Sequence, residues 1–397
     1  MKNSSNVGKI FKVINYNLKI LMAVALRNSL IQKSSSLVKV LDDVWQGFSI
    51  MATNEKCLKM SKKIGTHSGV FHCDEVLACF MLKQLPLYRD ADIIRTRDEA
   101  ILSTCDIVVD VGAVYDPSTH RFDHHQRSFN ETLSSVRPDL VKNKFIKLSS
   151  AGLIYAHYGL EVIAEICKTK DICLDSASLK CLFTYIYDIF VEEMDAIDNG
   201  VPMYPEGKPL YRINTNLSSR VGKMNLKWNE PEKLSSIDSL FHKAMSYVGA
   251  EFQQCVLEAA TDWWPAREIV RKSIKQRKEI HPSGEIFILE DRCPWKDHLY
   301  AIEEELGIEG ELKFVVFHDM SGSWRVQGIP VQPDSFICRV FLHRSWRGVR
   351  DQDLSDVAGI KDCVFCHSTG FIGGNQTKEG AIEMALKSLN AATIDKE

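Results

Sequence analysis

Residues 63–111 decide the fold, and they read KIGTHSGVFHCDEVLACFMLKQLPLYRDADIIRTRDEAILSTCDIVVDV. Short apolar runs alternate in this stretch with longer helical ones. We expect strands at 63–67, 91–96 and 106–111, and helices at 75–84 and 97–103. Strands separated by helices of this length imply parallel β-α-β crossovers. The stretch therefore predicts an α/β domain built on a parallel sheet.

Outside this stretch the pattern of helices and strands continues to the end of the chain. Helices are predicted at 151–166, 176–194 (stopped at Gly200), 237–280 (broken by Pro265) and 378–389. Strands are predicted at 286–289, 312–317 and 336–341. Prolines and polar residues between 201 and 235 indicate a linker. The chain is therefore expected to contain a second, smaller lobe after this linker.

The composition is that of an ordinary soluble globular protein. The chain has 397 residues, of which 45% are hydrophobic and 25% charged, with a net charge of −3. A net charge so near zero excludes a protein that coats nucleic acid by bulk electrostatics, so any such contact needs a local groove. The 12 scattered cysteines fit a reducing compartment. The apolar run at 20–26 is too short to span a bilayer, so no membrane helix is expected.

The first 41 residues differ from the rest, because they carry seven basic residues and no acidic one, with serines interspersed. This composition is typical of a mitochondrial transit segment. A disordered basic tail is the alternative. Met51 starts a second plausible chain, so a form that lacks this segment is conceivable.

Acidic residues and histidines gather at the ends of predicted elements. They are His67, His72, Asp74, Asp110, His120, Asp123, His124, His125, Asp195 and Asp198. In an open parallel sheet the loops at the carboxyl ends of the strands meet in one crevice. We therefore expect most of these side chains to lie close together.

Carboxylates mixed with imidazoles, without a set of thiolates, suit Mn²⁺, Mg²⁺, Fe or Zn²⁺. These residues exceed the ligands that one ion needs, which favours two ions that share a carboxylate. Asp110, alone at the end of a buried strand, is the natural bridge. Two such ions activate a water and stabilise the attacking and leaving oxygens of a phosphoryl displacement. Each element also has a plainer interpretation: a lone histidine is more often a core or surface residue, and Asp198-Asn199-Gly200 could be a turn.

Four segments together resemble a known family. They are GTHSGVFHCDE at 65–75, DVG at 110–112, HRFDHH at 120–125 and DAIDNG at 195–200. This set is similar to the melanocyte-proliferating-gene (Myg) exonuclease family, which is related to the DHH phosphoesterases. The similarity extends from about residue 62 to 392 and includes PWKDHL at 294–299 and GFIGGN at 370–375.

The resemblance implies an α/β fold with a parallel-sheet, DHH-like metal-binding domain followed by a smaller α+β substrate-binding lobe. The expected segments are a basic N-terminal extension at 1–60, the catalytic domain at 61–205, a linker and helical region at 206–282, and the C-terminal lobe at 283–397.

The resemblance also implies roles for individual residues. His67 and His72 would bind one ion, Asp74 and His124 the other, with Asp110 between them. His125 would contact the scissile phosphate, and Asp123 would orient the imidazoles. Asp195 is the first choice for a further ligand and Asp198 the second. Many DHH enzymes have a carboxylate where His72 stands, so this site is less negative. The expected cofactor is two Mn²⁺, with Mg²⁺ as the alternative.

Candidate substrate-binding residues come from the glycine-rich segment before the last helix and from the end of the second strand. They are Gly370, Gly373, Gly374, Asn375 and Arg97. Free N–H groups at the start of a helix bind phosphate readily, but a tight turn is the alternative. Trp295, Trp324 and Trp346 lie near basic residues and could equally stack on bases or fill a core.

The leading hypothesis is a metal-dependent phosphodiesterase, and the resemblance implies a 3′–5′ RNA exonuclease that acts on RNA or short oligonucleotides. One alternative is a phosphohydrolase for a small substrate, such as pyrophosphate or a cyclic dinucleotide. The other is a non-catalytic RNA-binding protein that retains the fold. The resemblance suggests the mitochondrion and the nucleus as locations, with the cytoplasm left open.

Overall fold

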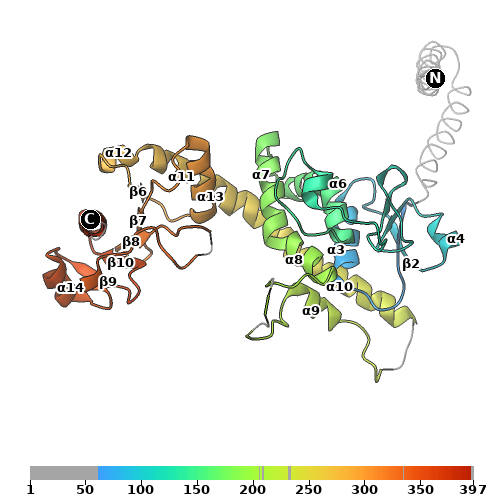
Figure 1. The fold of residues 1–397 in the computed structure, drawn as a ribbon. Helices are drawn as coiled ribbons and strands as arrows, with labels where there is room; N and C mark the ends of the chain where they lie inside the picture. Colours follow the sequence, from blue (N-terminus) through green and yellow to red (C-terminus); the bar gives the residue numbers. More distant parts are fainter. Residues whose placement is uncertain (1–60, 205, 208–209, 231–233, 334, 395–397) are drawn as a thin grey trace, which may run out of the picture. The chain divides into compact units, whose positions relative to one another are not determined.

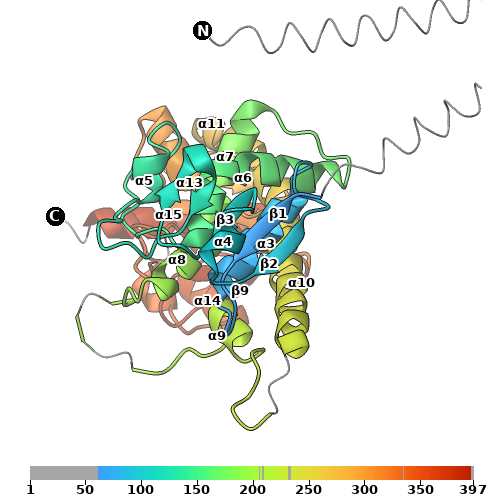
Figure 2. The ribbon, with the colours of Figure 1, turned by 90° about the vertical axis from the view of Figure 1, so that its right-hand side faces the viewer.

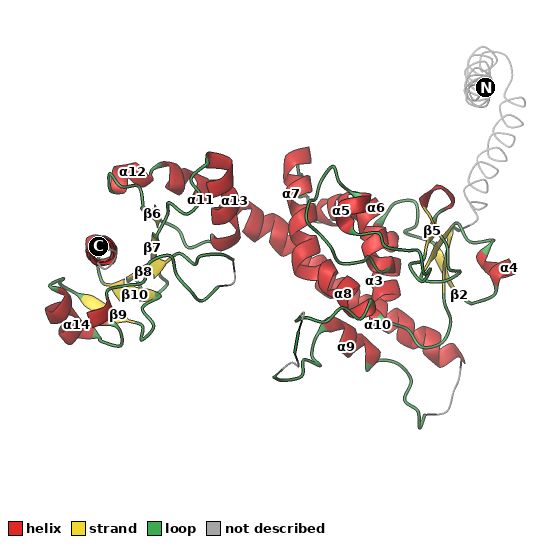
Figure 3. Ribbon diagram, in the orientation of Figure 1, coloured by secondary structure: helices red, strands yellow, loops and turns green. Residues whose placement is uncertain are grey.

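The computed structural model describes residues 61–394, except 205, 208–209, 231–233 and 334. These residues form a mixed α/β structure whose strands belong to two five-stranded sheets (Figures 1 and 3). Within the described part of the chain no helix is long and apolar enough to cross a membrane. The predicted transit segment lies outside the described residues and stays a prediction.

The first sheet contains the three strands expected from the opening stretch. Its strands are β1 (Lys63–Thr66), β2 (Asp92–Arg95), β3 (Ile107–Val109), β4 (Tyr115–Asp116) and β5 (Arg121–Phe122), in the order β2-β1-β3-β5-β4. Strand β1 pairs in parallel with β2 and β3, and β3 pairs in parallel with β5. Only β4 runs antiparallel to its neighbour β5. The carboxyl ends of β1, β3 and β5 therefore share one edge of the sheet.

Three helices pack on one another and form the core with this sheet: α3 (Cys73–Gln84), α6 (Ser150–Lys168) and α10 (Leu234–Glu258). Strands β1, β2 and β3 lie beside α3 in Figure 2. Most of α3 is buried on all sides, so its sequence is a continuous apolar run rather than an amphipathic one. The helix ends at Gln84 because Pro86 holds Leu85 in an extended conformation. Two short helices, α4 (Glu99–Leu102) and α5 (Leu133–Val136), lie in the connections.

The helix predicted at 176–194 is present but longer. It consists of α7 (Ser176–Ile186), one π-helical stretch at Tyr187–Val191 and α8 (Glu192–Asp198), and it ends where Gly200 adopts a positive φ of 67°. Only glycine takes this conformation without strain. Both Asp195 and Asp198 therefore lie on the last helical turns rather than in a loop after them.

The region predicted as a linker carries one short helix, α9 (Leu217–Gly222). The long helical stretch then contains α10, a π-helical segment at Ala259–Trp263, α11 (Trp264–Lys275) and α12 (Arg277–Ile280). Pro265 lies in the first turn of α11, directly after the π-helical segment. The chain stays helical through this position, so the predicted break at Pro265 is wrong.

The second sheet contains β6 (Ile286–Leu289), β7 (Phe314–His318), β8 (Trp324–Gly328), β9 (Cys363–Cys366) and β10 (Ile372–Asn375), in the order β6-β7-β8-β10-β9. Strands β6 and β7 are parallel, and the other neighbours are antiparallel. One set of apolar residues joins the sheet to α14 (Asp351–Ala358) and α15 (Lys378–Ile394), and another joins it to α11 and α13 (Lys296–Leu306). A short 3₁₀ turn spans Arg344–Trp346.

Two predictions for this region are wrong. The segment 336–341 forms no strand, and only Cys338 makes an isolated bridge, to Pro330. Phe336 is 97% exposed and Ile337 62% exposed, so the apolar run that suggested a strand is not buried. Residues 372–375 form strand β10 rather than a loop at a helix start. The glycine-rich composition hid this strand because glycine is uncommon in strand interiors.

Candidate metal centre

The predicted ligands meet at the edge of the first sheet where its parallel strands end. His67 directly follows β1, Asp110 directly follows β3, and His124 comes two residues after β5. Asp74 and Glu75 lie in the first turn of α3, whose start faces the same edge. The crossover topology therefore brings together residues that are up to 57 positions apart in the sequence.

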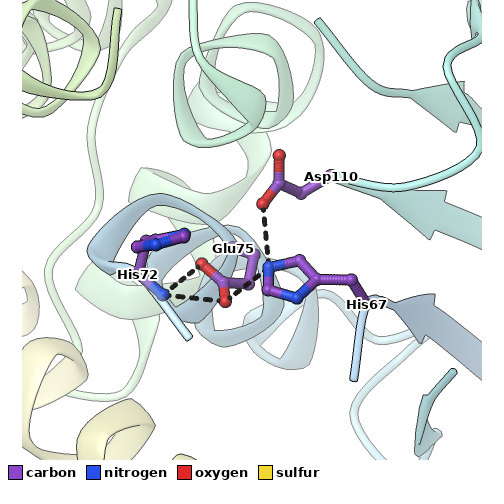
Figure 4. Close-up of side chains that lie close together, drawn as sticks. All are labelled: His67, His72, Glu75 and Asp110. Atoms are coloured by element: carbon purple, nitrogen blue, oxygen red, sulfur yellow. Dashed lines mark hydrogen bonds and ion pairs between the residues drawn. The ribbon is translucent and has the colours of Figure 1, made fainter. Parts of the chain in front are cut away.

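One group of candidate ligands is formed by His67, His72, Glu75 and Asp110. Figure 4 shows the ring of His67 pointing toward both carboxylates. Its Nε2 lies 3.0 Å from Oε1 of Glu75 and 3.3 Å from Oδ2 of Asp110. The carboxylate of Glu75 also accepts the backbone N–H of His72, at 2.9 and 3.0 Å, which fixes the start of α3.

A second group is formed by Asp74, His124 and Asp198. Nε2 of His124 lies 3.1 Å from Oδ2 of Asp198. Asp74 and His124 are buried, whereas Asp198 is partly exposed. The first turn of α3 contributes a carboxylate to each group, and Asp110 lies against a histidine of each.

Asp110 faces one imidazole with each of its oxygens. Oδ2 lies 3.3 Å from Nε2 of His67, and Oδ1 lies 3.5 Å from Nε2 of His124. The hydroxyl of Ser150 donates to Oδ1 at 3.2 Å. The backbone of Asp110 has a positive φ of 57°, a conformation that aspartate tolerates better than most residues but that still carries strain. Such strain is typical of functional sites.

The candidate ligands fit a bound cation, because the protein itself leaves the negative charge of a buried carboxylate without a partner. Asp74 is only 2% exposed, and neither of its carboxylate oxygens has a hydrogen-bond partner among the described residues. An isolated buried carboxylate is costly. Burial, and the negative charges of Asp110, Asp198 and Glu75, raise the pKa of Asp74 well above its usual range. A divalent cation would remove this cost.

The pKa values of the two histidines beside Asp110 are also raised. Burial lowers the pKa of His67, but Asp110 and Glu75 outweigh burial and raise the pKa to about 10. In the same way Asp110 and Asp198 raise the pKa of His124 to about 9. Burial raises the pKa of Asp110, but these imidazoles outweigh it and hold that pKa below its usual value. In the absence of a metal, protonated His67 and His124 therefore balance the negative charges of the carboxylates that a cation would otherwise balance.

His125 lies at the rim of the centre, where it forms a third group of candidate ligands with Asp110 and His124 and pairs with Asp123. Nδ1 of His125 lies 2.7 Å from Oδ1 of Asp123, whose Oδ2 accepts the backbone N–H of Ala113 at 2.6 Å. The His125 side chain is 61% exposed, whereas Asp123 is buried. The hydrogen bond to Asp123 raises the pKa of His125. Asp123 thus orients His125, and the other ring nitrogen of His125 remains available to a ligand.

The two helical aspartates have different surroundings in the structure, which favour Asp198 over Asp195 as a candidate ligand, and the choice between them stays a prediction. Asp195 is fully buried, and its oxygens accept hydrogen bonds from Ser149 and Tyr187 instead of joining a ligand group. Asp198, the second choice, lies beside His124. The sequence could not separate them, because both lie on α8 and their side-chain directions depend on how that helix packs. His120 is exposed and bonds Tyr158.

None of the predicted substrate-binding residues belongs to a ligand group among the described residues. Arg97 is exposed in the turn after β2, and Gly370 lies in a turn with a φ of 78°. Gly373 and Gly374 are buried in β10, between β8 and β9. The fully buried side chain of Asn375 donates to the carbonyl of Lys361 and accepts from the N–H and hydroxyl of Thr377. A role of these residues in substrate binding stays a prediction.

Glu75 is the candidate ligand that the sequence analysis missed. The sequence pattern marks Glu75 only as the beginning of a helix, since one carboxylate in a first helical turn is common. A signal was present nonetheless: a second acidic residue directly after Asp74 enters the same buried turn. Its full burial and its 3.0 Å contact with His67 distinguish it from a surface residue.

Comparisons with known proteins identify the family of this chain. The MYG1 exonuclease family model, described as "Uncharacterised protein family (UPF0160)", matches residues 63–389. The MYG1 exonuclease of Homo sapiens is 47% identical over 328 residues, which cover 82% of this chain and 85% of the relative. That of Bos taurus is also 47% identical, over 82% and 84% of the two chains. A MYG1 protein of Caenorhabditis elegans is 49% identical over 83% of this chain and 96% of its own. The chain belongs to the MYG1 exonuclease family.

Proposed function

We propose that this chain is a metal-dependent phosphodiesterase that removes nucleotides from the 3′ end of RNA, with two divalent ions in the candidate metal centre. The observation that carries the proposal is the sharing of Asp110 between two groups of ligands. The buried carboxylate of Asp74, which has no hydrogen-bond partner among the described residues, supports it further. Carboxylate and imidazole ligands without thiolates favour Mn²⁺, with Mg²⁺ as the alternative.

Two such ions, when bound, supply the Lewis acidity for an in-line displacement at phosphorus. His67, His72, Glu75 and Asp110 would hold one of them. Asp74, His124 and Asp198 would hold the other, together with Asp110, which faces His124. The buried carboxylates lower the positive charge of the centre, and the burial of His67 and His124 keeps bulk water from competing for the same positions.

His125 is the proposed contact to the scissile phosphate. Its Nδ1 is held by Asp123, so its Nε2 can donate a hydrogen bond to a phosphate oxygen. The same hydrogen bond raises the pKa of His125 and so favours its cationic form. A cation at the rim stabilises the negative charge that develops on the phosphate in the transition state.

A cavity of about 490 Å³ in the region of the second sheet is a candidate for holding the nucleic acid. Its wall includes the carboxyl ends of the parallel strands β6 and β7 and the start of α13. Arg292 and Lys296 line it and form no ion pair among the described residues, whereas Arg325 is paired with Asp319. This volume suits a ligand of nucleotide size, and the two unpaired cations suit its phosphates.

The RNA substrate and the 3′ polarity come from the family resemblance alone, whereas the names of the relatives support an exonuclease without either detail. The assay that tests both uses the purified protein with Mn²⁺, RNA labelled at either end, DNA and pyrophosphate. We expect mononucleotides from the 3′ end of RNA, and we expect none with the Asp110→Asn variant.

Three outcomes contradict the proposal in different ways. Release of label from the 5′ end would reverse the polarity. Hydrolysis of pyrophosphate alone would identify a small-substrate phosphohydrolase. Binding of RNA without hydrolysis, unchanged in Asp110→Asn, would identify a non-catalytic RNA-binding protein. We further propose that the protein acts in the mitochondrion and the nucleus, and that the basic extension directs it to the first of these.

A further inference from the structure

Asp195 is a fully enclosed carboxylate next to the metal centre. Its Oδ1 accepts the backbone N–H of Ser149 at 2.9 Å and the Ser149 hydroxyl at 2.7 Å. Its Oδ2 accepts the hydroxyl of Tyr187 at 2.8 Å. Three donors satisfy the carboxylate entirely within the protein, so it has no need of a cation.

This carboxylate determines where helix α6 begins. Ser149 is the N-cap of α6, and Asp195 holds both its backbone and its side chain. A Cβ atom at Gly152 would lie 2.3 Å from Oδ1 of Asp195, so only glycine permits this close approach. The first turn of α6 is therefore built around Asp195.

The first residue of α6 reaches the metal centre. Ser150 is fully buried, and its hydroxyl donates to Oδ1 of Asp110 at 3.2 Å. Asp110 has a strained backbone, so its side chain depends on external contacts to keep its direction. Among neutral side chains of the described residues, Ser150 is the one that donates a hydrogen bond to this carboxylate.

Asp195 also lies on the helix that carries Asp198. The two residues are three positions apart on α8, and Asp198 approaches His124 to 3.1 Å. Fixing Asp195 fixes the rotation of α8 about its axis, because residues three apart share one face of a helix. One buried carboxylate is thus connected to two candidate ligands, Asp110 through Ser150 and Asp198 through α8.

We propose that Asp195 and Ser150 are positioning residues of the metal centre. Asp195 anchors the start of α6 and the end of α8. Ser150 directs the carboxylate of Asp110 toward the space between the two ligand groups. The inference rests on the proposed two-ion function. Neither residue touches substrate or metal. Both act by reducing the freedom of carboxylates that would bind the ions.

The test compares Ser150→Ala and Asp195→Asn with the wild type for manganese affinity, by calorimetric titration, and for kcat and KM on a labelled RNA. Loss of an outer partner of a metal ligand costs about 10- to 100-fold in metal affinity or activity. We expect weaker manganese binding and a kcat lowered by about that factor in both variants, with KM for RNA unchanged. Ser150→Ala removes a single hydroxyl at a helix start and keeps the test valid where Asp195→Asn folds poorly.

Ser388→Ala is the matched control, because Ser388 is an equally buried serine whose hydroxyl bonds Met384 and His343 in the region of the second sheet. It should lower the melting temperature without changing manganese affinity or kcat. Manganese affinity and kcat within twofold of wild type in Ser150→Ala would overturn the inference. So would loss of one ion in Asp195→Asn with Ser150→Ala unaffected, since Asp195 would then be a ligand. A wild type that binds manganese and hydrolyses RNA leaves the proposed function standing in either case.

Discussion

Oδ1 of Asp110 lies 3.5 Å from Nε2 of His124, while the other oxygen of the same carboxylate lies 3.3 Å from Nε2 of His67. The two histidines follow strands β5 and β1, which both neighbour β3 in the sheet. A carboxylate at the end of the strand between them can therefore serve two groups of ligands at once. This relationship underlies the predictions below.

Asp110→Asn should abolish most of the activity while keeping the fold. Asparagine tolerates a positive φ, so the backbone of residue 110 needs no change. Loss of the shared negative charge removes several kcal/mol of charge stabilisation, so kcat should fall by at least about 100-fold. Single-turnover hydrolysis of labelled RNA measures this, and circular dichroism verifies the fold. Residual activity within tenfold of wild type would contradict the assignment of Asp110.

Glu75→Gln should weaken the binding of one ion and leave the other. Glutamine keeps the size of the side chain and can still accept the N–H of His72, but it removes the charge beside His67. We expect one of the two manganese dissociation constants to rise by about 10- to 100-fold. Glu99→Gln, which changes an exposed glutamate in the first turn of α4, is the control and should leave both constants unchanged.

The stability of the metal-free protein should fall as the pH rises above about 6.5. His67 and His124 have pKa values raised to about 10 and about 9 in the folded state, so they contribute stability that is fully present below pH 6.5. That contribution is lost as the pH rises through those two values. The raised pKa of Asp74 acts in the same direction.

Because metal ligands must lose their protons, manganese should bind more tightly at higher pH and release protons when it binds. Melting curves between pH 6 and 8.5, with and without Mn²⁺, measure both effects. The stabilisation by Mn²⁺ should grow with pH. A stabilisation that is constant or that shrinks would show that these groups do not bind the metal.

The double variant Arg292→Ala/Lys296→Ala should weaken RNA binding without impairing the chemistry. Both cations line the cavity near the start of α13 and have no acidic partner among the described residues. We expect KM for RNA to rise by about tenfold and the salt dependence of binding to become shallower, by about one in slope for each lost phosphate contact. Hydrolysis of bis(p-nitrophenyl) phosphate, which is too small to need this cavity, should be unchanged. Lys361→Ala, an exposed lysine of the same region, is the control.

Removal of residues 1–50 should abolish mitochondrial accumulation. A fluorescent fusion of the full chain should enter mitochondria, because the basic, acid-free start has the composition of a transit segment. A fusion that starts at Met51 should remain outside them. Equal distribution of the two fusions would leave the basic tail without a targeting role.

Strand and helix alternation predicted the first sheet well, because the β-α-β pattern restricts both pairing and direction. Once β1, β2 and β3 are parallel, His67 and Asp110 must end at the same edge. The grouping of the candidate ligands followed from topology alone. The order of Asp195 and Asp198 could not follow, because it depends on the rotation of α8 against the start of α6.

The second sheet was harder to predict because its local composition contradicts its structure. Glycine tolerates many conformations, so the glycines of β10 do not indicate a strand. The segment that suggested a phosphate-binding loop instead pairs with strands β8 and β9. The apolar segment at 336–341 gave the opposite error, since it stays largely exposed instead of pairing. Whether each segment forms a strand depends on whether it is buried, and burial is a property of the tertiary structure that the local sequence does not show.

Anomalous diffraction from crystals soaked in manganese tests the central claim most directly. The account predicts two manganese peaks, one on each side of the Asp110 carboxylate, with His67 and Glu75 near one peak and Asp74, His124 and Asp198 near the other. A single peak, or peaks that do not contact Asp110, would contradict it.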